Sequence, residues 1–148
     1  MSSPENKTLT ALDGIRVGHF TDLEGGTGVT VILFERPAIG AVDTTGMATS
    51  SRQIDSLEMM HPGSAVHAVC LAGGSAFGLD AATGVVRYLE EQGVGFDLVV
   101  TKLPIVPTAV IFDLSFMDPS ARPDPSMAYQ ACLHASSSPV EQGCVGAG

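Results

Sequence analysis

The feature that most constrains the fold is the run AVCLAGGSAFGLDAA at residues 68–82. Its apolar beginning predicts a buried strand, and its end opens a helical pattern that continues to Gln92. Gly73, Gly74 and Ser75 lie between the two. Two residues without a Cβ let the backbone approach a ligand or another segment closely, and serine often caps a helix N-terminus. The run therefore predicts a strand, a tight corner and a helix, an arrangement that can build a binding site.

The remaining segments complete an α/β pattern. Strands are predicted at residues 15–21, 27–34, 38–43, 66–71 and 105–114, and helices at 54–60, 75–92 and 123–135. Pro37 is expected to end one strand, so that the next strand, at 38–43, pairs with it as a hairpin. A hairpin followed by a strand, a helix, a strand and a helix predicts a mixed sheet.

The composition predicts one globular domain without a nucleic-acid or membrane partner. The 148 residues are 45% hydrophobic and 16% charged, which suits a buried core. The formal net charge is −9 and there is no basic stripe, which argues against nucleic acid. No apolar run approaches the roughly 20 residues of a membrane span, and residues 1–10 are too polar for a secretory signal. High apolar content with low charge also favours an oligomer.

Cysteine and histidine spacing argues against a metal site. Cys70, Cys132 and Cys144 are an odd number without a CxxC pair, which favours a reducing, cytoplasmic setting over a disulfide framework. The four histidines lie singly, with neither HxxxH nor HExxH spacing, so no metal is expected. Cys144 lies in a glycine-rich context and is a candidate reactive thiol, although no base is near it in the sequence.

The glycine-serine corner leaves several chemical interpretations open. It matches neither the GxGxxG spacing of dinucleotide-binding loops nor a Walker loop. It nearly matches the nucleophile elbow GxSxG, but Phe77 stands where the second glycine belongs. The order Ser75, Asp113, His134 is that of the α/β-hydrolases, so a small serine hydrolase is one alternative. Ser75 as a plain helix cap is the simpler interpretation.

Five blocks, taken in order, resemble the DmpA-type aminopeptidases. The blocks are VGHFTD at 17–22, GTGVTV at 26–31, LAGGSAFGLD at 71–80, PIVP at 104–107 with VIFD at 110–113, and GCVGAG at 143–148. This L-aminopeptidase/D-esterase group also includes β-peptidyl aminopeptidases and nylon-oligomer endo-hydrolases. The resemblance extends from about residue 12 to residue 148, and the third block is its most specific part.

The resemblance implies a fold and a reaction. The fold would be the α-β-β-α sandwich of N-terminal-nucleophile hydrolases, incomplete in this chain. Such an enzyme cleaves its own precursor before a Ser or Thr, which becomes the nucleophile with its own α-amine as base. The implied substrates are small peptides, amides or esters, and neither metal nor organic cofactor is expected. The family also implies a homo-oligomer of paired α and β chains.

One departure from the family limits what can be carried over. In the family the glycine-rich block continues, and the nucleophile lies well beyond it, whereas this sequence ends at Gly148. Residues 1–11 are therefore expected to be a loose leader and residues 12–148 the N-terminal part of a single peptidase domain, truncated within the glycine-rich segment. No catalytic residue is then expected in the chain, and the chain alone is expected to be inactive.

The expected substrate pocket consists of Gly73, Gly74, Ser75, Phe112 and Asp113. Some family members carry a tyrosine at the position of Phe112, where it helps to hold the reacting carbonyl. Phe112 has no hydroxyl, so it can shape a pocket but cannot donate to an oxyanion. Asp113 is expected to line a site at a strand end or to bind loop amides. The alternative from another functional class is a non-catalytic binding or assembly module.

Overall fold

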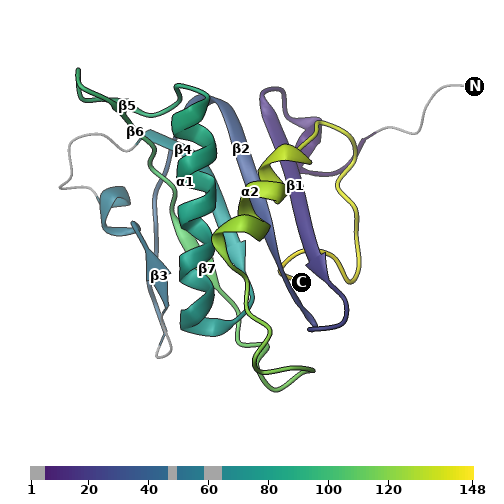
Figure 1. Ribbon diagram of the computed structural model, residues 1–148. Coiled ribbons are helices and arrows are strands. Elements are labelled where there is room, and N and C mark those ends of the chain that lie inside the picture. Colours follow the sequence, from purple (N-terminus) through teal and green to yellow (C-terminus); the bar gives the residue numbers. More distant parts are fainter. Residues whose placement is uncertain (1–5, 47–49, 59–64) are drawn as a thin grey trace, which may run out of the picture.

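The computed structural model describes residues 6–46, 50–58 and 65–148 (Figure 1). The main sheet contains, in spatial order, β1 (Ile15–Asp22), β2 (Thr27–Ile39), β4 (Ala65–Ala72), β7 (Thr108–Val110) and β3 (Ser51–Arg52). A separate hairpin pairs β5 (Phe96–Asp97) with β6 (Lys102–Leu103). The α-helices are α1 (Ala82–Glu91) and α2 (Pro125–Leu133), and 3-10 helices cover Leu9–Ala11, Asp55–Leu57 and Ser75–Ala81.

The main sheet is mixed, as the sequence predicts. β2 pairs antiparallel with both β1 and β4, whereas β4 and β7 are parallel and β3 is antiparallel to β7. The 3-10 helix Ser75–Ala81, α1 and the β5–β6 hairpin connect the parallel strands β4 and β7. This connection places the ends of β4 and β7 side by side with the β1–β2 turn at one end of the sheet (Figure 1).

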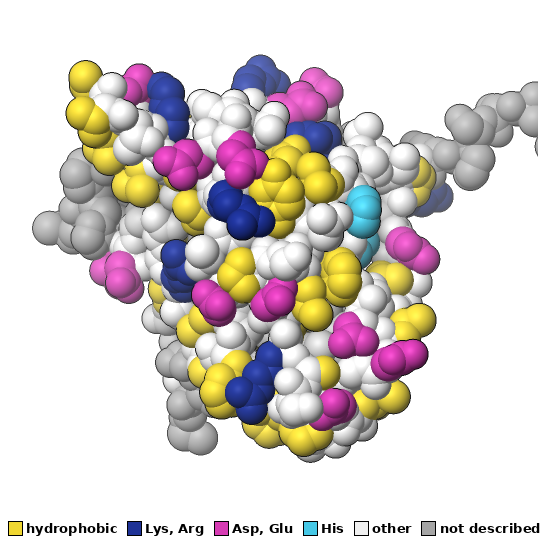
Figure 2. Space-filling view, in the orientation of Figure 1, with side chains coloured by type: hydrophobic (Ala, Val, Ile, Leu, Met, Phe, Trp, Pro, Cys, Tyr) yellow, Lys and Arg dark blue, Asp and Glu magenta, His cyan; other side chains and the backbone are white. Residues whose placement is uncertain are grey.

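Both α-helices lie on the same face of the sheet (Figure 1). Alternate residues of β2 and β4 point to this face and meet apolar side chains of the helices. The buried cluster includes Val29, Val31, Leu33, Ala68 and Cys70 from the strands and Val85, Leu89, Ala128 and Cys132 from the helices. The outer side of the helices carries charged side chains of both signs, so it faces solvent (Figure 2). One sheet and one helical layer correspond to half of the expected sandwich.

The predicted strand at 38–43 and its hairpin with 27–34 are wrong. β2 continues through Pro37 to Ile39, and its hairpin partner is β1. The pairing of β2 with β4 shifts register between Leu33 and Ala38, which places Pro37 in an irregular stretch. A proline at a bulge removes no ladder hydrogen bond, so it does not end the strand.

Ser75 is not the predicted side-chain cap. Gly74 has φ +78° and Ser75 has φ +53°, and the helix that begins at Ser75 has no side-chain cap. The predicted helix at 75–92 is 3-10 up to Ala81 and α-helical only from Ala82. In contrast, α2 begins as its sequence suggests, because Asp124 accepts a hydrogen bond from the Met127 N–H at 2.8 Å and Pro125 follows it.

The described part of the predicted leader, residues 6–11, is packed on the domain. Thr10 is buried, and its hydroxyl donates to the Ser138 carbonyl oxygen at 2.7 Å. The helical turns predicted at 54–60 are the 3-10 helix Asp55–Leu57, while residues 59–64 lie outside the described residues. Within the described part of the chain, no helix combines the length and apolar character needed to cross a membrane.

Candidate substrate pocket

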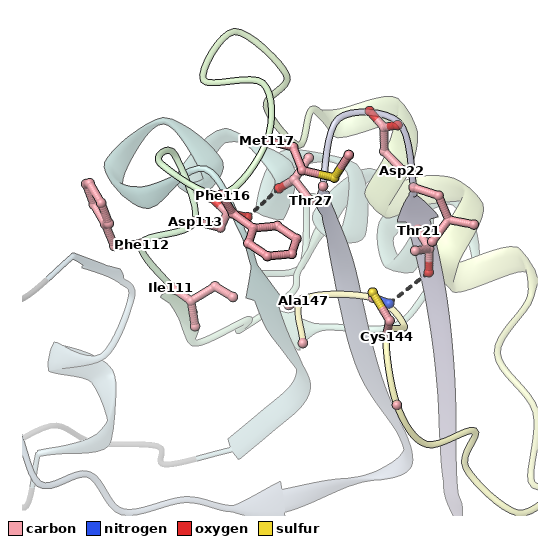
Figure 3. Close-up of a pocket in the computed structure, with 15 residues that line it drawn as sticks. Thr21, Asp22, Thr27, Ile111, Phe112, Asp113, Phe116, Met117, Cys144 and Ala147 are labelled. Atoms are coloured by element: carbon pink, nitrogen blue, oxygen red, sulfur yellow. Dashed lines mark hydrogen bonds between the residues drawn. The ribbon is translucent and has the colours of Figure 1, made fainter.

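A pocket of about 450 Å³ opens at the end of the sheet where β1 turns into β2 (Figure 3). Three segments that are far apart in the sequence form its walls. They are the β1–β2 turn (Thr21, Asp22, Leu23, Gly26, Thr27), the segment after β7 (Ile111, Phe112, Asp113, Phe116, Met117) and the C-terminal segment (Gly143, Cys144, Gly146, Ala147, Gly148). A largely apolar pocket with a few polar groups is typical of small-molecule sites.

The β1–β2 turn is fixed by its own hydrogen bonds. The Gly25 N–H donates to Asp22 Oδ1 at 2.8 Å, and the Gly26 N–H donates to the Asp22 carbonyl oxygen at 2.8 Å. An aspartate that bonds amides ahead of it in this way is a common turn former. The turn therefore holds Asp22 and the start of β2 at the mouth of the pocket.

Asp113 joins the pocket to the glycine-serine corner. Its Oδ1 accepts the Gly74 N–H at 2.6 Å, and its Oδ2 accepts the Thr27 hydroxyl at 2.7 Å. A Cβ on Gly73 would lie 2.0 Å from Asp113 Oδ2, so the carboxylate occupies the space that a side chain there would need. Asp113 thus lines the cavity and also accepts the N–H of a loop residue.

The five predicted pocket residues are therefore divided by the structure. Phe112 and Asp113 line the pocket, whereas Gly73, Gly74 and Ser75 are not among its lining residues and lie behind Asp113. The Ser75 N–H donates to the Ile111 carbonyl oxygen at 2.9 Å, which ties the corner to the segment after β7. The corner supports the pocket wall without facing the cavity.

Four exposed apolar side chains follow β7, and Ile111, at 47%, is the least exposed of them. Phe112 and Phe116 are each 71% exposed and Met117 is 53% exposed. Figure 3 shows the Phe112 ring at the outer edge of the pocket, away from Phe116 and Met117. Large apolar side chains left in water at the mouth of a cavity often mark a binding surface.

The triad Ser75, Asp113 and His134 is not assembled. Pro123 contacts the corner at Gly74, whereas His134 follows the opposite end of α2. With a rise of 1.5 Å per residue, the nine residues of α2 separate those two points by roughly 13 Å. Both oxygens of Asp113 are also occupied by other donors. The geometry does not support the small serine hydrolase.

The three cysteines differ in accessibility. Cys70 and Cys132 are buried, and burial raises the pKa of each thiol to about 12. Cys144 is exposed and lines the pocket. Among the described lining residues there is neither a histidine nor a lysine to serve as a general base for the Cys144 thiol. The described residues also contain no group of three or more potential metal ligands.

Several lining residues were not predicted from the sequence. Thr21 and Thr27 lie within blocks that carry the family resemblance, but only the strand pairing shows that they face a cavity. Phe116 and Met117 lie outside every block. The one signal that could have found them is a pair of large apolar residues directly after a predicted strand end.

Comparisons with known proteins agree with the family resemblance. An uncharacterized aminopeptidase of Mycobacterium leprae is 41% identical over an aligned length of 163 residues. The alignment covers 100% of this chain and 45% of that protein. A 6-aminohexanoate-oligomer endohydrolase of Paenarthrobacter ureafaciens is 34% identical over 138 residues, covering 91% of this chain and 36% of that protein. The chain thus spans less than half the length of these curated relatives.

Solved structures confirm the fold. The L-aminopeptidase D-Ala-esterase/amidase of Ochrobactrum anthropi, described as a variant of the Ntn hydrolase fold, superposes with a TM-score of 0.77 at 20% identity. The match covers 99% of this chain and 44% of that chain. A Pyrococcus horikoshii protein gives a TM-score of 0.68 at 21% identity, covering 99% and 45% of the two chains. The sheet with its single helical layer is thus an incomplete sandwich of this type.

The match to a family model extends over far more of the chain than any single sequence block does. The sequence model of peptidase family S58 matches residues 7–148, which include all five blocks and every residue that lines the pocket. On this evidence of sequence and fold together, the chain belongs to peptidase family S58.

Proposed function

We propose that this chain supplies the substrate pocket of a self-processing N-terminal-nucleophile hydrolase that acts on small peptides, amides or esters. The observation that carries the proposal is the convergence of the five sequence blocks. Residues 17–22, 26–31, 110–113 and 143–148 all contribute to the lining of one pocket. The remaining block, residues 71–80, reaches it through the hydrogen bond from Gly74 to Asp113.

The pocket has the chemistry to hold a substrate with an apolar side chain and a free amine. Ile111, Phe116 and Met117 supply apolar surface, and Asp22, which carries a carboxylate, is among the lining residues. A carboxylate beside an apolar surface favours a cationic amine over a neutral one. The names of the relatives, an aminopeptidase and an aminohexanoate-oligomer hydrolase, are consistent with amide substrates of this kind.

We further propose that the nucleophile belongs to sequence beyond residue 148. Among the described residues that line the pocket there is no serine, and the one cysteine is not accompanied by a histidine or a lysine. On this proposal residues 12–148 are one part of a single domain that cleaves itself before a Ser or Thr, whose α-amine then serves as base. The complete protein would be a cytoplasmic homo-oligomer, and the three free cysteines agree with a reducing compartment.

The first test is hydrolysis by the purified chain. We expect no release of p-nitroaniline from alanine p-nitroanilide by the 148-residue protein. If the wild-type chain does release p-nitroaniline, and Ser75→Ala or Cys144→Ala abolishes that release, the proposal is contradicted. The substituted residue would then be a nucleophile within the chain. Asp118→Ala, which changes an exposed turn residue outside the pocket lining, is the control variant.

The second test supplies the missing part. A chimera in which this chain is followed by the corresponding C-terminal residues of the Mycobacterium leprae relative should cleave itself into two chains and hydrolyse the anilide. The cleavage is measured by mass spectrometry. A chimera that melts cooperatively, yet neither cleaves itself nor hydrolyses the substrate, would contradict the enzymatic proposal and favour a binding module.

A further inference from the structure

The C-terminal glycine-rich segment is attached to the sheet through side chains of β1 and β2. The Gly146 N–H donates to Thr21 Oγ1 at 2.8 Å, a contact drawn in Figure 3, and the Ala147 N–H donates to Thr30 Oγ1 at 3.2 Å. Gly146 and Ala147 are also part of the pocket lining. These two hydroxyls therefore determine where one wall of the pocket stands.

The segment lies too close to the strands for a side chain to intervene. A Cβ on Gly146 would lie 2.1 Å from Thr30 Oγ1 and 2.7 Å from His19 Nδ1. Gly146 also has φ +62°, a conformation that glycine adopts without strain. On the strand side, a Cβ on Gly28 would lie 2.2 Å from the Gly146 carbonyl oxygen. Direct backbone-to-sheet contact makes the position of this wall sensitive to the groups beneath it.

His19 is the group beneath the second hydroxyl. Its Nδ1 lies 3.0 Å from Thr30 Oγ1, so the ring fixes the hydroxyl that accepts the Ala147 N–H. The other ring nitrogen, Nε2, is buried and has no hydrogen-bond partner among the described residues. In the neutral ring whose Nδ1 accepts the Thr30 hydroxyl, the proton is on Nε2; a second proton would turn Nδ1 from an acceptor into a donor and add a charge to a partly buried ring, which is costly.

The surroundings of His19 favour its neutral form. Burial lowers the pKa of His19, and the attraction of Glu141 opposes that shift less strongly. The hollow beside the ring is lined by Glu141 from the C-terminal segment and by His134 at the end of α2, together with uncharged residues of β1 and the segment 136–140. Its titratable members are thus one carboxylate and a second imidazole.

We propose that His19 is a positioning residue which, in its neutral form, holds Thr30 so that Gly146 and Ala147 form a fixed wall of the pocket. Protonation makes the buried site unfavourable for the ring, so the ring leaves and the segment loosens at acid pH. That this wall serves substrate binding rests on the proposed function. The attachment of the segment to His19 and Thr30 does not depend on it.

Amide hydrogen exchange at Gly146 and Ala147 tests this proposal in the 148-residue chain. His19→Ala should lower the protection factor of Ala147 about fivefold at pH 7.5, the effect of one modest hydrogen bond. His19→Asn should restore protection, because its side-chain oxygen can accept near the position of Nδ1. Wild type should lose protection between pH 7.5 and pH 5, whereas His19→Asn, which does not titrate, should not.

His67→Asn is the matched control: His67, like His19, has a pKa lowered by burial, but its ring accepts from the Ile105 N–H instead. In His67→Asn the protection factor of Ala147, divided by that of a core amide such as Val31, should depend on pH as it does in wild type. Equal protection in His19→Ala and wild type, or a pH profile that persists in His19→Asn, would overturn the proposal. Amide exchange needs neither ligand nor turnover, so failure of the proposed function would leave this result interpretable.

Discussion

Replacement of Asp113 by alanine should destabilise the domain more than any change at an exposed carboxylate. The carboxylate accepts one hydrogen bond from the Gly74 N–H at 2.6 Å and another from the Thr27 hydroxyl at 2.7 Å. It thereby joins β2, the corner after β4 and the segment after β7. Alanine leaves two donors without their acceptor at the point where these segments meet.

Hydrogen bonds to charged groups contribute about 1.5–3 kcal/mol each. Because Asp113 is only partly buried, water can replace part of the loss, and the lower end of the range applies to both bonds. Asp113→Ala should therefore cost about 3 kcal/mol, a Tm decrease of roughly 6–12 °C for a domain of this size. Asp113→Asn keeps an acceptor for Gly74 and should cost only about 1 kcal/mol.

A double-mutant cycle provides the assay. Thr27→Val alone should cost about 1.5 kcal/mol, but almost nothing once Asp113→Ala is present, because the shared bond is already lost. Free energies are measured by urea denaturation followed by circular dichroism. Asp118→Ala is the control, since the exposed Asp118 side chain accepts hydrogen bonds from Ser120 within its own turn and does not join distant segments. Strict additivity in the cycle, or equal Tm values for Asp113→Ala and Asp118→Ala, would refute this account of the corner.

Three further predictions concern other parts of the molecule. At pH 7.5 the native chain should react with Ellman's reagent at one thiol, that of Cys144, because the other two thiols are buried and have a pKa of about 12. Reaction of all three thiols before unfolding would contradict this. Burial lowers the pKa of His19 and His67 below 6.5, so the unfolded chain binds more protons below that pH. Stability present at pH 7.5 should therefore decline as the pH falls through 6.5, and a urea midpoint that stays constant to pH 5.5 would argue against this. Phe112→Tyr should change the free energy of unfolding by less than about 0.5 kcal/mol, because the ring is 71% exposed, and a larger loss in urea denaturation would mean that the ring packs more tightly than described.

Local sequence predicts those elements whose signal is local. The apolar run before Gly73 gives β4, and Asp124 with Pro125 marks the start of α2. β3, in contrast, has only two residues and exists because it pairs with β7, more than fifty positions away. No local pattern encodes such a pairing.

The residues of the candidate site also divide into those with a local sequence signal and those that depend on distant contacts. Phe112 and Asp113 were predicted because they end an apolar run and belong to a block of the family resemblance. The cap predicted at Ser75 is wrong because the helix begins at Ser75 itself and Gly74, which has no side chain to accept a hydrogen bond, occupies the capping position. The roles of Thr21, Thr30 and the glycine-rich segment depend on contacts between the chain's two ends, which only the folded structure reveals.

The central claim is that three distant segments form one substrate pocket, and NMR mapping of ligand binding tests it most directly. Alanine p-nitroanilide, titrated into the 15N-labelled chain, should produce saturable shift changes at the amides of Thr27, Phe112 and Ala147, one from each wall. A Phe116→Ser variant should weaken binding without altering the fold, since Phe116 is 71% exposed. Saturable shifts confined to residues outside this pocket, or no saturable shifts at all, would contradict the account.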